Sequence, residues 1–176
     1  MKRKIQRIFF HTFKFFIGLL VYVNARWYMK FYNSLLRFYG FKINGTPRFI
    51  AKSAKFDDFN LITLGDRLVV SSNVIFLTHD YSYTTGLISI GDKPKTDIGI
   101  LGPISIGSNV FIGMNSILLP GTTIGNNVIV GAGSVVRGKI PDNVVISGNP
   151  AIIISDIQSH TEKLKLKEYQ RVVDKK

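Results

Sequence analysis

The sequence contains no cysteine in its 176 residues. This absence excludes disulfide bonds, zinc sites built from thiolates and cysteine nucleophiles. A chain without disulfides suits a reducing compartment, so we expect a cytoplasmic location and leave peripheral attachment to the inner face of the cell membrane open. Hydrophobic residues make up 45% of the chain, which is enough for a folded core and excludes disorder over its whole length.

Acidic residues are absent from the first 55 positions. Residues 1–55 hold twelve of the 23 Lys and Arg residues, whereas residues 56–176 hold the other eleven together with all eleven Asp and Glu residues. The net charge of +12 therefore belongs to the first third of the chain (12 − 0), and the remainder is neutral (11 − 11). The neutral part carries no nucleic-acid-binding motif, so we expect no nucleic acid partner.

A long apolar run is also missing. The longest run, Phe15–Val23, has nine residues, against about 20 in a membrane-spanning helix, and no secretion-signal cleavage site follows it. Residues 1–42 predict a basic, aromatic-rich amphipathic helical segment, with apolar residues at three- and four-residue spacing and Arg7, His11 and Lys14 on another face. Such a segment can lie on an anionic membrane surface, or it can pack against the protein's own body or a neighbouring subunit, and the sequence leaves these readings open.

A strict six-residue repeat dominates the second half of the chain. Aliphatic residues recur at every sixth position from 106 to 136, and a small or β-branched residue precedes each of them by two positions. A period of six does not fit an α-helix. It predicts an all-β solenoid, with one short strand and one corner in every six residues, over residues 43–154. We expect the recurring glycines near the corners, where the backbone is tight.

Two segments depart from this repeat. Residues 78–103 are polar, rich in Gly and Tyr, and predict a loop excursion from the solenoid, where function is often found. Residues 155–176 predict a C-terminal amphipathic helix that begins with a capping box of Ser159 and Glu162. The candidate packing residues of this helix are Leu166, Tyr169, Val172 and Val173.

The stretch Ile104–Ile154 combines isoleucine–glycine repeats in register with Leu119-Pro120-Gly121, with Gly131-Ala132-Gly133-Ser134 and with the ending Gly148-Asn149-Pro150-Ala151. These motifs resemble the hexapeptide-repeat acyltransferases, in particular the maltose/galactoside and virginiamycin acetyltransferase branch and the related polysaccharide O-acetyltransferases. The resemblance implies a left-handed parallel β-helix, a homotrimer, acetyl-CoA as donor in a groove between neighbouring prisms, and no metal. It also implies acetyl transfer to a sugar hydroxyl of a surface-polysaccharide or glycolipid precursor.

The resemblance places the catalytic histidine at His79, where the first coils give way to the excursion. Acetyl transfer to a hydroxyl needs a base that takes the O–H proton as the oxygen attacks the thioester carbonyl, and an imidazole suits that role. The other two histidines, His11 and His160, lie in predicted helices, where we expect them to be solvated. Asp80 is a candidate for orienting His79, although adjacency in sequence does not establish contact.

The same resemblance suggests the donor site. Phe111 stands where the family usually has tryptophan, and relatives commonly carry Lys or Arg where this chain has Ile152-Ile153-Ile154. Arg137 and Lys139 are the candidates for supplying that missing charge to the phosphates of CoA. The residues that we expect to bind the donor are Phe111, Gly113, Ala132, Arg137 and Lys139.

The acceptor is less defined than the donor. No counterpart of the acceptor-binding asparagine of the galactoside branch is found near residues 50–60, which argues against a free simple sugar. Alternatives that stay open are N-acetylation of an amino sugar, transfer to a free small molecule such as serine or an antibiotic, and a non-catalytic β-helix scaffold. The residues that we expect on the acceptor side are Asp80, Tyr81, Tyr83, Lys93 and Lys95.

Overall fold

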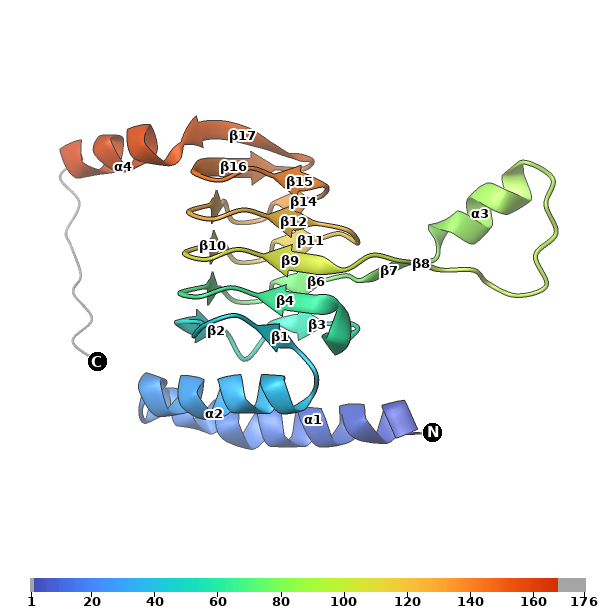
Figure 1. The fold of residues 1–176 in the computed structure, drawn as a ribbon, viewed down its shortest axis with the longest axis horizontal. Coiled ribbons are helices and arrows are strands. Elements are labelled where there is room, and N and C mark those ends of the chain that lie inside the picture. The colour runs from blue at the N-terminus through green and yellow to red at the C-terminus, as the bar shows by residue number, and fades with distance from the viewer. Residues whose placement is uncertain (1, 168–176) are drawn as a thin grey trace.

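A computed structural model describes residues 2–167, with the backbone alone for residues 2–4. The chain begins with two antiparallel helices, α1 (Lys2–Leu19) and α2 (Ala25–Phe38), joined through the short 3-10 turn η1 (Leu20–Tyr22) (Figure 1). Asn24 caps α2, because its side chain accepts hydrogen bonds from the backbone N–H groups of Arg26 and Trp27. This helical hairpin lies across the first coil of the solenoid and closes its N-terminal end.

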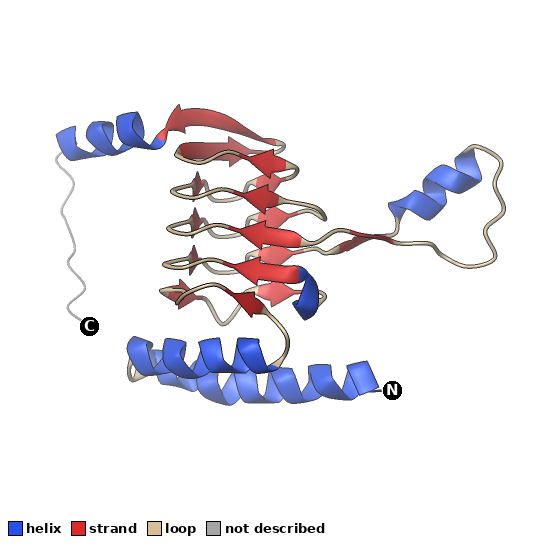
Figure 2. Cartoon of the chain, in the orientation of Figure 1, coloured by secondary structure: helices blue, strands red, loops and turns tan. Residues whose placement is uncertain are grey.

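Three sheets form the body of the molecule (Figure 2). The first contains β1 (Lys42–Ile43), β4 (Ile62–Leu64), β9 (Ile104–Ile106), β12 (Thr123–Ile124) and β15 (Lys139–Ile140). The second contains β2 (Phe49–Ile50), β5 (Val69–Val70), β10 (Phe111–Ile112), β13 (Ile129–Val130), β16 (Val144–Gly148) and β17 (Ala151–Asp156). The third contains β3 (Lys55–Phe56), β6 (Ile75–Phe76), β11 (Ile117–Leu118) and β14 (Val135–Val136).

Consecutive coils stack strand on strand. Phe111 pairs with Ile129, which lies one coil later and three six-residue repeats further along the chain. Val69 pairs with Phe111 although the whole excursion separates them in sequence, so the excursion is inserted between the second and third coils and leaves their register intact. All strand pairs of the stack are parallel up to the antiparallel closing pair of β16 and β17. The coils form a left-handed parallel β-helix with helices at both ends, which confirms the predicted fold class (Figure 1).

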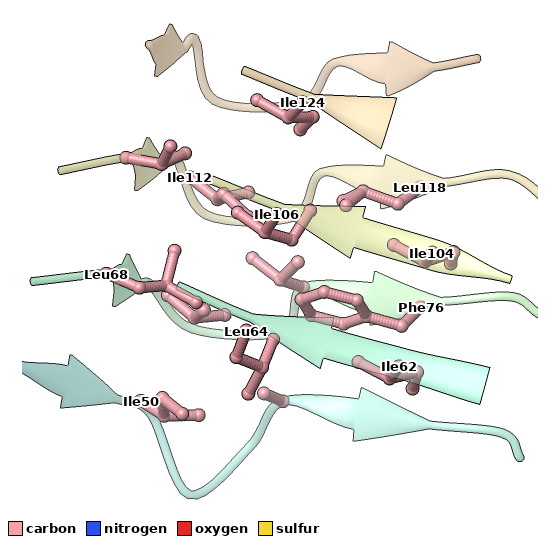
Figure 3. Packing of buried hydrophobic residues seen from close by; sticks show 14 of the residues in the cluster. Ile50, Ile62, Leu64, Leu68, Phe76, Ile104, Ile106, Ile112, Leu118 and Ile124 are labelled. Carbon is pink, nitrogen blue, oxygen red and sulfur yellow. The ribbon is translucent and has the colours of Figure 1, made fainter. Parts of the chain in front are cut away.

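The repeat places one aliphatic side chain of each strand inside the prism (Figure 3). Ile106, Ile112 and Leu118 are all buried, and the small residues two positions earlier, such as Ser116, are buried as well. Each fully buried aliphatic side chain contributes about 1.5–3 kcal/mol of hydrophobic free energy. The core is therefore continuous along the stack, because each coil covers the open end of the coil before it.

Asparagine and glycine are both found at the corners of the coils. Glycines lie near the corners as predicted, and the left-handed backbone there is adopted both by glycines such as Gly121 (φ 81°) and by asparagines such as Asn109 (φ 56°) and Asn127 (φ 55°). The side chains of these two asparagines form a ladder, since Asn109 Nδ2 donates to Asn127 Oδ1 at 2.9 Å. Gly107 serves close packing instead: a Cβ at this position would lie 2.5 Å from the carbonyl oxygen of Gly125 in the next coil.

The excursion leaves the body as an antiparallel ribbon of β7 (His79–Asp80) and β8 (Ile100–Leu101) (Figure 2). The ribbon carries helix α3 (Ser82–Ser89), which the polar, Gly-rich composition did not indicate. A further 3-10 turn, η2 (Phe59–Leu61), lies between the first and second coils.

The C-terminal helix α4 (Ile157–Leu166) follows β17. Its N-cap is Asp156, whose side chain accepts a hydrogen bond from Ser159 N at 2.8 Å. The predicted capping box is therefore wrong, because β17 extends to Asp156 and starts the helix earlier. Leu166 is exposed, and Tyr169, Val172 and Val173 lie outside the described residues.

Candidate active site

His79 lies at the point where the chain leaves the second coil. It follows β6 closely and is the first residue of β7, where it pairs with Leu101 of the returning strand β8. Its side chain is 34% exposed. The imidazole is therefore held by neighbouring groups on one side and is accessible to a ligand on the other.

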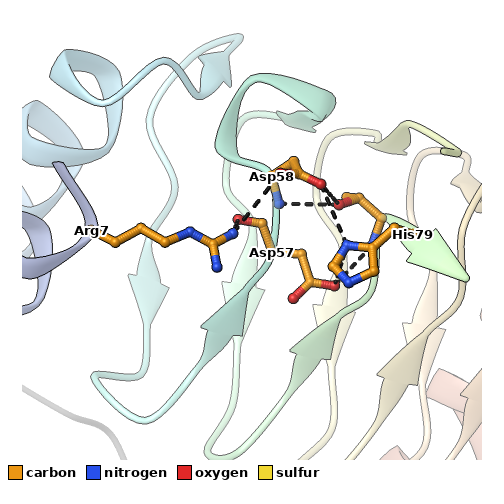
Figure 4. A network of polar contacts seen from close by, with 5 residues as sticks. Arg7, Asp57, Asp58 and His79 are labelled. Atoms are coloured by element: carbon orange, nitrogen blue, oxygen red, sulfur yellow. Dashed lines mark hydrogen bonds and ion pairs between the residues drawn. The ribbon is translucent and has the colours of Figure 1, made fainter. Parts of the chain in front are cut away.

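Two carboxylates from the coil below face this imidazole (Figure 4). Asp57 and Asp58 directly follow β3, which pairs with β6, and an Oδ2 atom of each lies 3.5 Å from His79 Nδ1. The buried Thr78 fixes both carboxylates: its N–H donates to Asp57 Oδ2 at 3.2 Å, and its hydroxyl donates to Asp58 Oδ2 at 3.1 Å. Carboxylates beside Nδ1 favour a proton on that nitrogen, which leaves Nε2 with a free lone pair.

The N-terminal helix reaches the same carboxylates. Arg7 Nη2 donates a 2.7 Å hydrogen bond to the backbone carbonyl of Asp57 and lies 3.9 Å from Asp58 Oδ1. Arg7 is thus linked to His79 through the two aspartates (Figure 4). Neither the aspartates nor Arg7 was predicted, because the three segments that meet here are distant in sequence.

A cavity of about 490 Å³ opens in front of His79. Tyr81 forms one wall, since its ring meets the imidazole edge-on with the centroids 5.4 Å apart. The same ring lies over Gly99, where a Cβ would be 2.9 Å from it, and Asp97 lines the cavity from the returning arm of the excursion. Arg7 lines the opposite side. A histidine, an aromatic wall and polar groups of both signs are suited to a polar, hydroxyl-bearing ligand.

The predicted acceptor residues separate into different places. Tyr81 lines the cavity, whereas the Asp80 carboxylate accepts a 2.8 Å hydrogen bond from Ser82 N. This hydrogen bond lowers the pKa of the exposed Asp80 carboxyl. Asp80 was a candidate for orienting His79, and it is the carboxylates of Asp57 and Asp58 that face His79 Nδ1. Three further residues are exposed on the outer part of the excursion, away from the lining of this cavity: Tyr83, Lys93 and Lys95.

The residues predicted to bind the donor form two groups. Phe111 is exposed on β10, and Gly113 and Ala132 follow it on stacked corners, since a Cβ at Gly113 would lie 2.5 Å from Ala132 N. Arg137 and Lys139 lie at another corner of the prism, between the third and first sheets, which is also where the chain leaves the body at His79. Hydrogen bonds from Ser82 lower the pKa of Asp80, and the positive charge of Arg137 adds to this effect.

Comparison with known proteins places the chain in a family. The bacterial transferase hexapeptide family (six repeats) matches residues 103–138. Protein CapG of Staphylococcus aureus is 44% identical over 131 residues, which cover 73% of each protein. The galactoside O-acetyltransferase of Escherichia coli K12 is 34% identical over 114 residues, which cover 65% of this chain and 53% of that protein. The chain therefore belongs to the hexapeptide-repeat acetyltransferase family.

Solved structures agree with this fold. A maltose O-acetyltransferase from Clostridium difficile 630 superposes with a TM-score of 0.61 at 25% identity, covering 86% of each chain. A galactoside acetyltransferase in complex with coenzyme A gives a TM-score of 0.62 at 22% identity, covering 97% of this chain and 90% of that one. At that identity the likeness shows the fold alone. The matched region spans about half the length of several of the curated relatives.

Proposed function

We propose that this chain transfers the acetyl group of acetyl-CoA to a hydroxyl of a carbohydrate, within the precursor of a surface polysaccharide or glycolipid. The observation that carries the proposal is the imidazole of His79, which faces two carboxylates at Nδ1 and borders an open cavity. Names of relatives support the reaction class: one is a galactoside O-acetyltransferase, and another is a putative lipopolysaccharide biosynthesis O-acetyl transferase of Escherichia coli K12. Related structures contain acetyl coenzyme A or coenzyme A. Use of acetyl-CoA agrees with a cytoplasmic location.

In this reaction Nε2 of His79 accepts the hydroxyl proton while the acceptor oxygen attacks the thioester carbonyl carbon. The tetrahedral intermediate then collapses, the C–S bond breaks, and the imidazolium returns the proton to the leaving CoA sulfur. Asp57 and Asp58 stabilise the imidazolium between these two steps, because their negative charges lie 3.5 Å from Nδ1. A positioned general base of this kind contributes about 10²–10⁴ in rate.

For the donor we propose the edge formed by Phe111, Gly113 and Ala132, where Phe111 and Ala132 are exposed and Gly113 is buried between the coils. This edge and the corner at His79 are different corners of the prism. A homotrimer, which the family resemblance implies, would bring the donor edge of one copy beside His79 of the next, with Arg137 and Lys139 near the CoA phosphates. Three exposed apolar side chains on β17, in the same sheet as Phe111, support a contact between copies: Ile152, Ile153 and Ile154.

The proposal is tested by measuring transfer of label from labelled acetyl-CoA to a panel of acceptors. The panel includes a membrane glycolipid extract, free sugars, amino sugars and serine. We expect His79→Ala and His79→Gln to lose transfer by about 10²–10⁴ while they bind acetyl-CoA as the unchanged protein does. His160→Ala is the control, because this histidine lies on α4 at the C-terminal end of the solenoid, and it should transfer normally.

The site of the label decides among the alternatives. Label in an amide would identify N-acetylation of an amino sugar, and label in a free compound would identify a small-molecule acceptor. No transfer to any acceptor, together with no binding of acetyl-CoA by the unchanged protein, would favour the non-catalytic scaffold and overturn the proposal.

A further inference from the structure

Helix α1 packs one side on the solenoid, with Phe10 in the core cluster and Ile17 packed against it, and leaves most of its other apolar residues exposed. Its inner side carries Phe10 and Lys14, and the Lys14 ammonium donates a 2.6 Å hydrogen bond to the carbonyl of Ala54. Its outer side carries an apolar stripe at three- and four-residue spacing. The exposed members of this stripe are Ile5, Ile8, Phe9, Phe16 and Leu19. A water-soluble domain normally buries such a stripe against its core. Here the stripe stays outside, while the half-buried Lys14 lies beside Phe10 on the inner side.

Helix α2 extends the same surface. Trp27 and Phe31 are exposed and stack with their ring centroids 5.8 Å apart, and Phe38 is 83% exposed. Lys30 lies over the Trp27 ring, 5.3 Å from its centroid. The buried residues of α2, such as Tyr32, belong to the core cluster instead. We refer to the exposed apolar sides of α1 and α2 together as the hairpin face.

Charge distinguishes between the surfaces that could cover the hairpin face. Residues 1–55 hold twelve basic residues and no acidic residue. Among them Arg26 and Lys30 are exposed on α2, so a second copy docked face to face would bring like charges together. An anionic lipid surface is complementary to them, and it also accepts aromatic and aliphatic side chains at the acyl boundary.

The contacts of α1 with the body favour a helix that lies along such a surface over one that crosses it. The window Ile5–Tyr22 is long and apolar enough to span a membrane, although the nine-residue apolar run in the sequence did not indicate this. Of this window, 11% is buried inside the protein. The buried part includes Phe10, which packs on Tyr39 and Phe59 of the body. A helix that is fixed to the solenoid on one side and apolar on the other is suited to the membrane interface.

A groove joins the hairpin face to His79. It has a volume of about 640 Å³. Its apolar wall includes Phe9, Phe13, Phe38 and Phe59. Arg7 and Asp58 line both this groove and the cavity at His79, so the two spaces adjoin. An apolar chain in the groove would therefore place a polar group attached to it beside the imidazole.

We propose that the hairpin face docks this protein on an anionic lipid bilayer, and that the acceptor is anchored in that bilayer with its lipid part in the groove and its sugar at His79. The acceptor half rests on the acetyl transfer proposed above, whereas the docking half does not. The two halves can therefore be tested separately.

Docking is tested by flotation of the full chain with phosphatidylcholine vesicles, with and without about one third phosphatidylglycerol. We expect binding that needs the anionic lipid and weakens between about 0.1 M and 1 M salt, where the screening length falls from about 10 Å to about 3 Å. Ile8→Ser combined with Phe16→Ser removes two exposed stripe residues and should weaken binding about tenfold or more. The matched control is Leu164→Ser with Leu166→Ser, two exposed residues of α4, which should bind as the unchanged protein does.

Charge is tested in the same way. Arg26→Glu with Lys30→Glu, both exposed on α2, should lower binding to anionic vesicles, and Lys163→Glu on α4 should not. Two outcomes would overturn docking. One is no flotation of the unchanged chain with anionic vesicles. The other is that the stripe variant binds vesicles as well as the unchanged protein does, while its mass in solution falls. That result would show that the hairpin face is a contact between copies of the chain.

The acceptor half is tested with one glycan in two forms, attached to its lipid in vesicles and released from it. We expect Ile8→Ser with Phe16→Ser to lose transfer to the lipid-attached form and to keep transfer to the released form. Equal transfer by this variant to both forms would overturn the lipid-anchored acceptor. Vesicle binding without any acetyl transfer would refute the proposed function and leave docking intact.

Discussion

Replacing Asp57 and Asp58 by asparagine removes both negative charges that face His79 while keeping the side-chain volumes. One oxygen of each carboxylate, Oδ2, lies 3.5 Å from His79 Nδ1. A full charge pair at that distance is worth about 1 kcal/mol in water and about 5 kcal/mol at an effective dielectric constant of 20. The three side chains are 24–34% exposed, so we take a value near the lower end, about 1.4 kcal/mol for each carboxylate, because water screens the pair.

This estimate predicts about a tenfold loss of kcat for each single asparagine variant and about a hundredfold loss for the double variant. KM for both substrates should change little, because in the proposed reaction the carboxylates act on the imidazolium, which forms only after the substrates are bound. The assay is acetyl transfer under saturating donor, with thermal unfolding to show that the fold is kept. Nitrogen-15 NMR of His79 should show the proton on Nδ1 in the unchanged protein and a mixture of tautomers in the double variant. A double variant with kcat within threefold of the unchanged protein would refute the assignment of these aspartates.

Two stability predictions follow from the packing. Burial lowers the pKa of Lys14 from 10.5 to about 8, so the unfolded chain binds more protons between these values and stability rises with pH across that window. Denaturant titrations should find the free energy of unfolding of the unchanged protein about 2 kcal/mol higher at pH 9.5 than at pH 7. Lys14→Met should remove this gain, and the variant should be the more stable protein at pH 7. A gain that persists in the variant would exclude Lys14 as its source. Gly107→Ala should cost about 1–3 kcal/mol, because its Cβ would lie 2.5 Å from the carbonyl oxygen of Gly125. Gly86→Ala in α3 has open space at the Cβ position and should stabilise by up to about 1 kcal/mol; equal effects of the two alanines would contradict the close-packing role of Gly107.

The solenoid was predictable because its information is local and repeated. A six-residue period fixes which side chain of each strand points inward, and Ile106, Ile112 and Leu118 are buried as that period requires. The repeat also shows where the regular coils stop, next to His79, whereas the catalytic role expected of His79 came from the family resemblance. The helix inside the excursion was not predictable, because residues 82–89 contain glycine and threonine and lack a clear apolar period.

The partners of His79 could not be read from the period. Counting back one regular coil, which is three repeats of six, leads from His79 to Leu61. The first coil does not keep that length, because Phe56 pairs with Phe76, a longer step than the one from Phe111 to Ile129. A step of 20 residues, as from Phe56 to Phe76, leads from His79 to Phe59, and Asp57 and Asp58 just before Phe59 face the imidazole. A lengthened coil changes which residues are stacked without breaking the alternation of buried positions, so the apolar pattern does not reveal it.

The sequence by itself determined the family, the coil architecture, the location of the histidine and the two faces of the N-terminal helix. Only the tertiary structure decided which of those two faces packs on the solenoid: the face with Phe10 and the half-buried Lys14 is packed, and the face with Phe16 is exposed. Periodicity separates the faces of a helix, but the surface that each face meets depends on segments far away in the chain. Contacts of that kind join Arg7, Asp58 and His79 into one site.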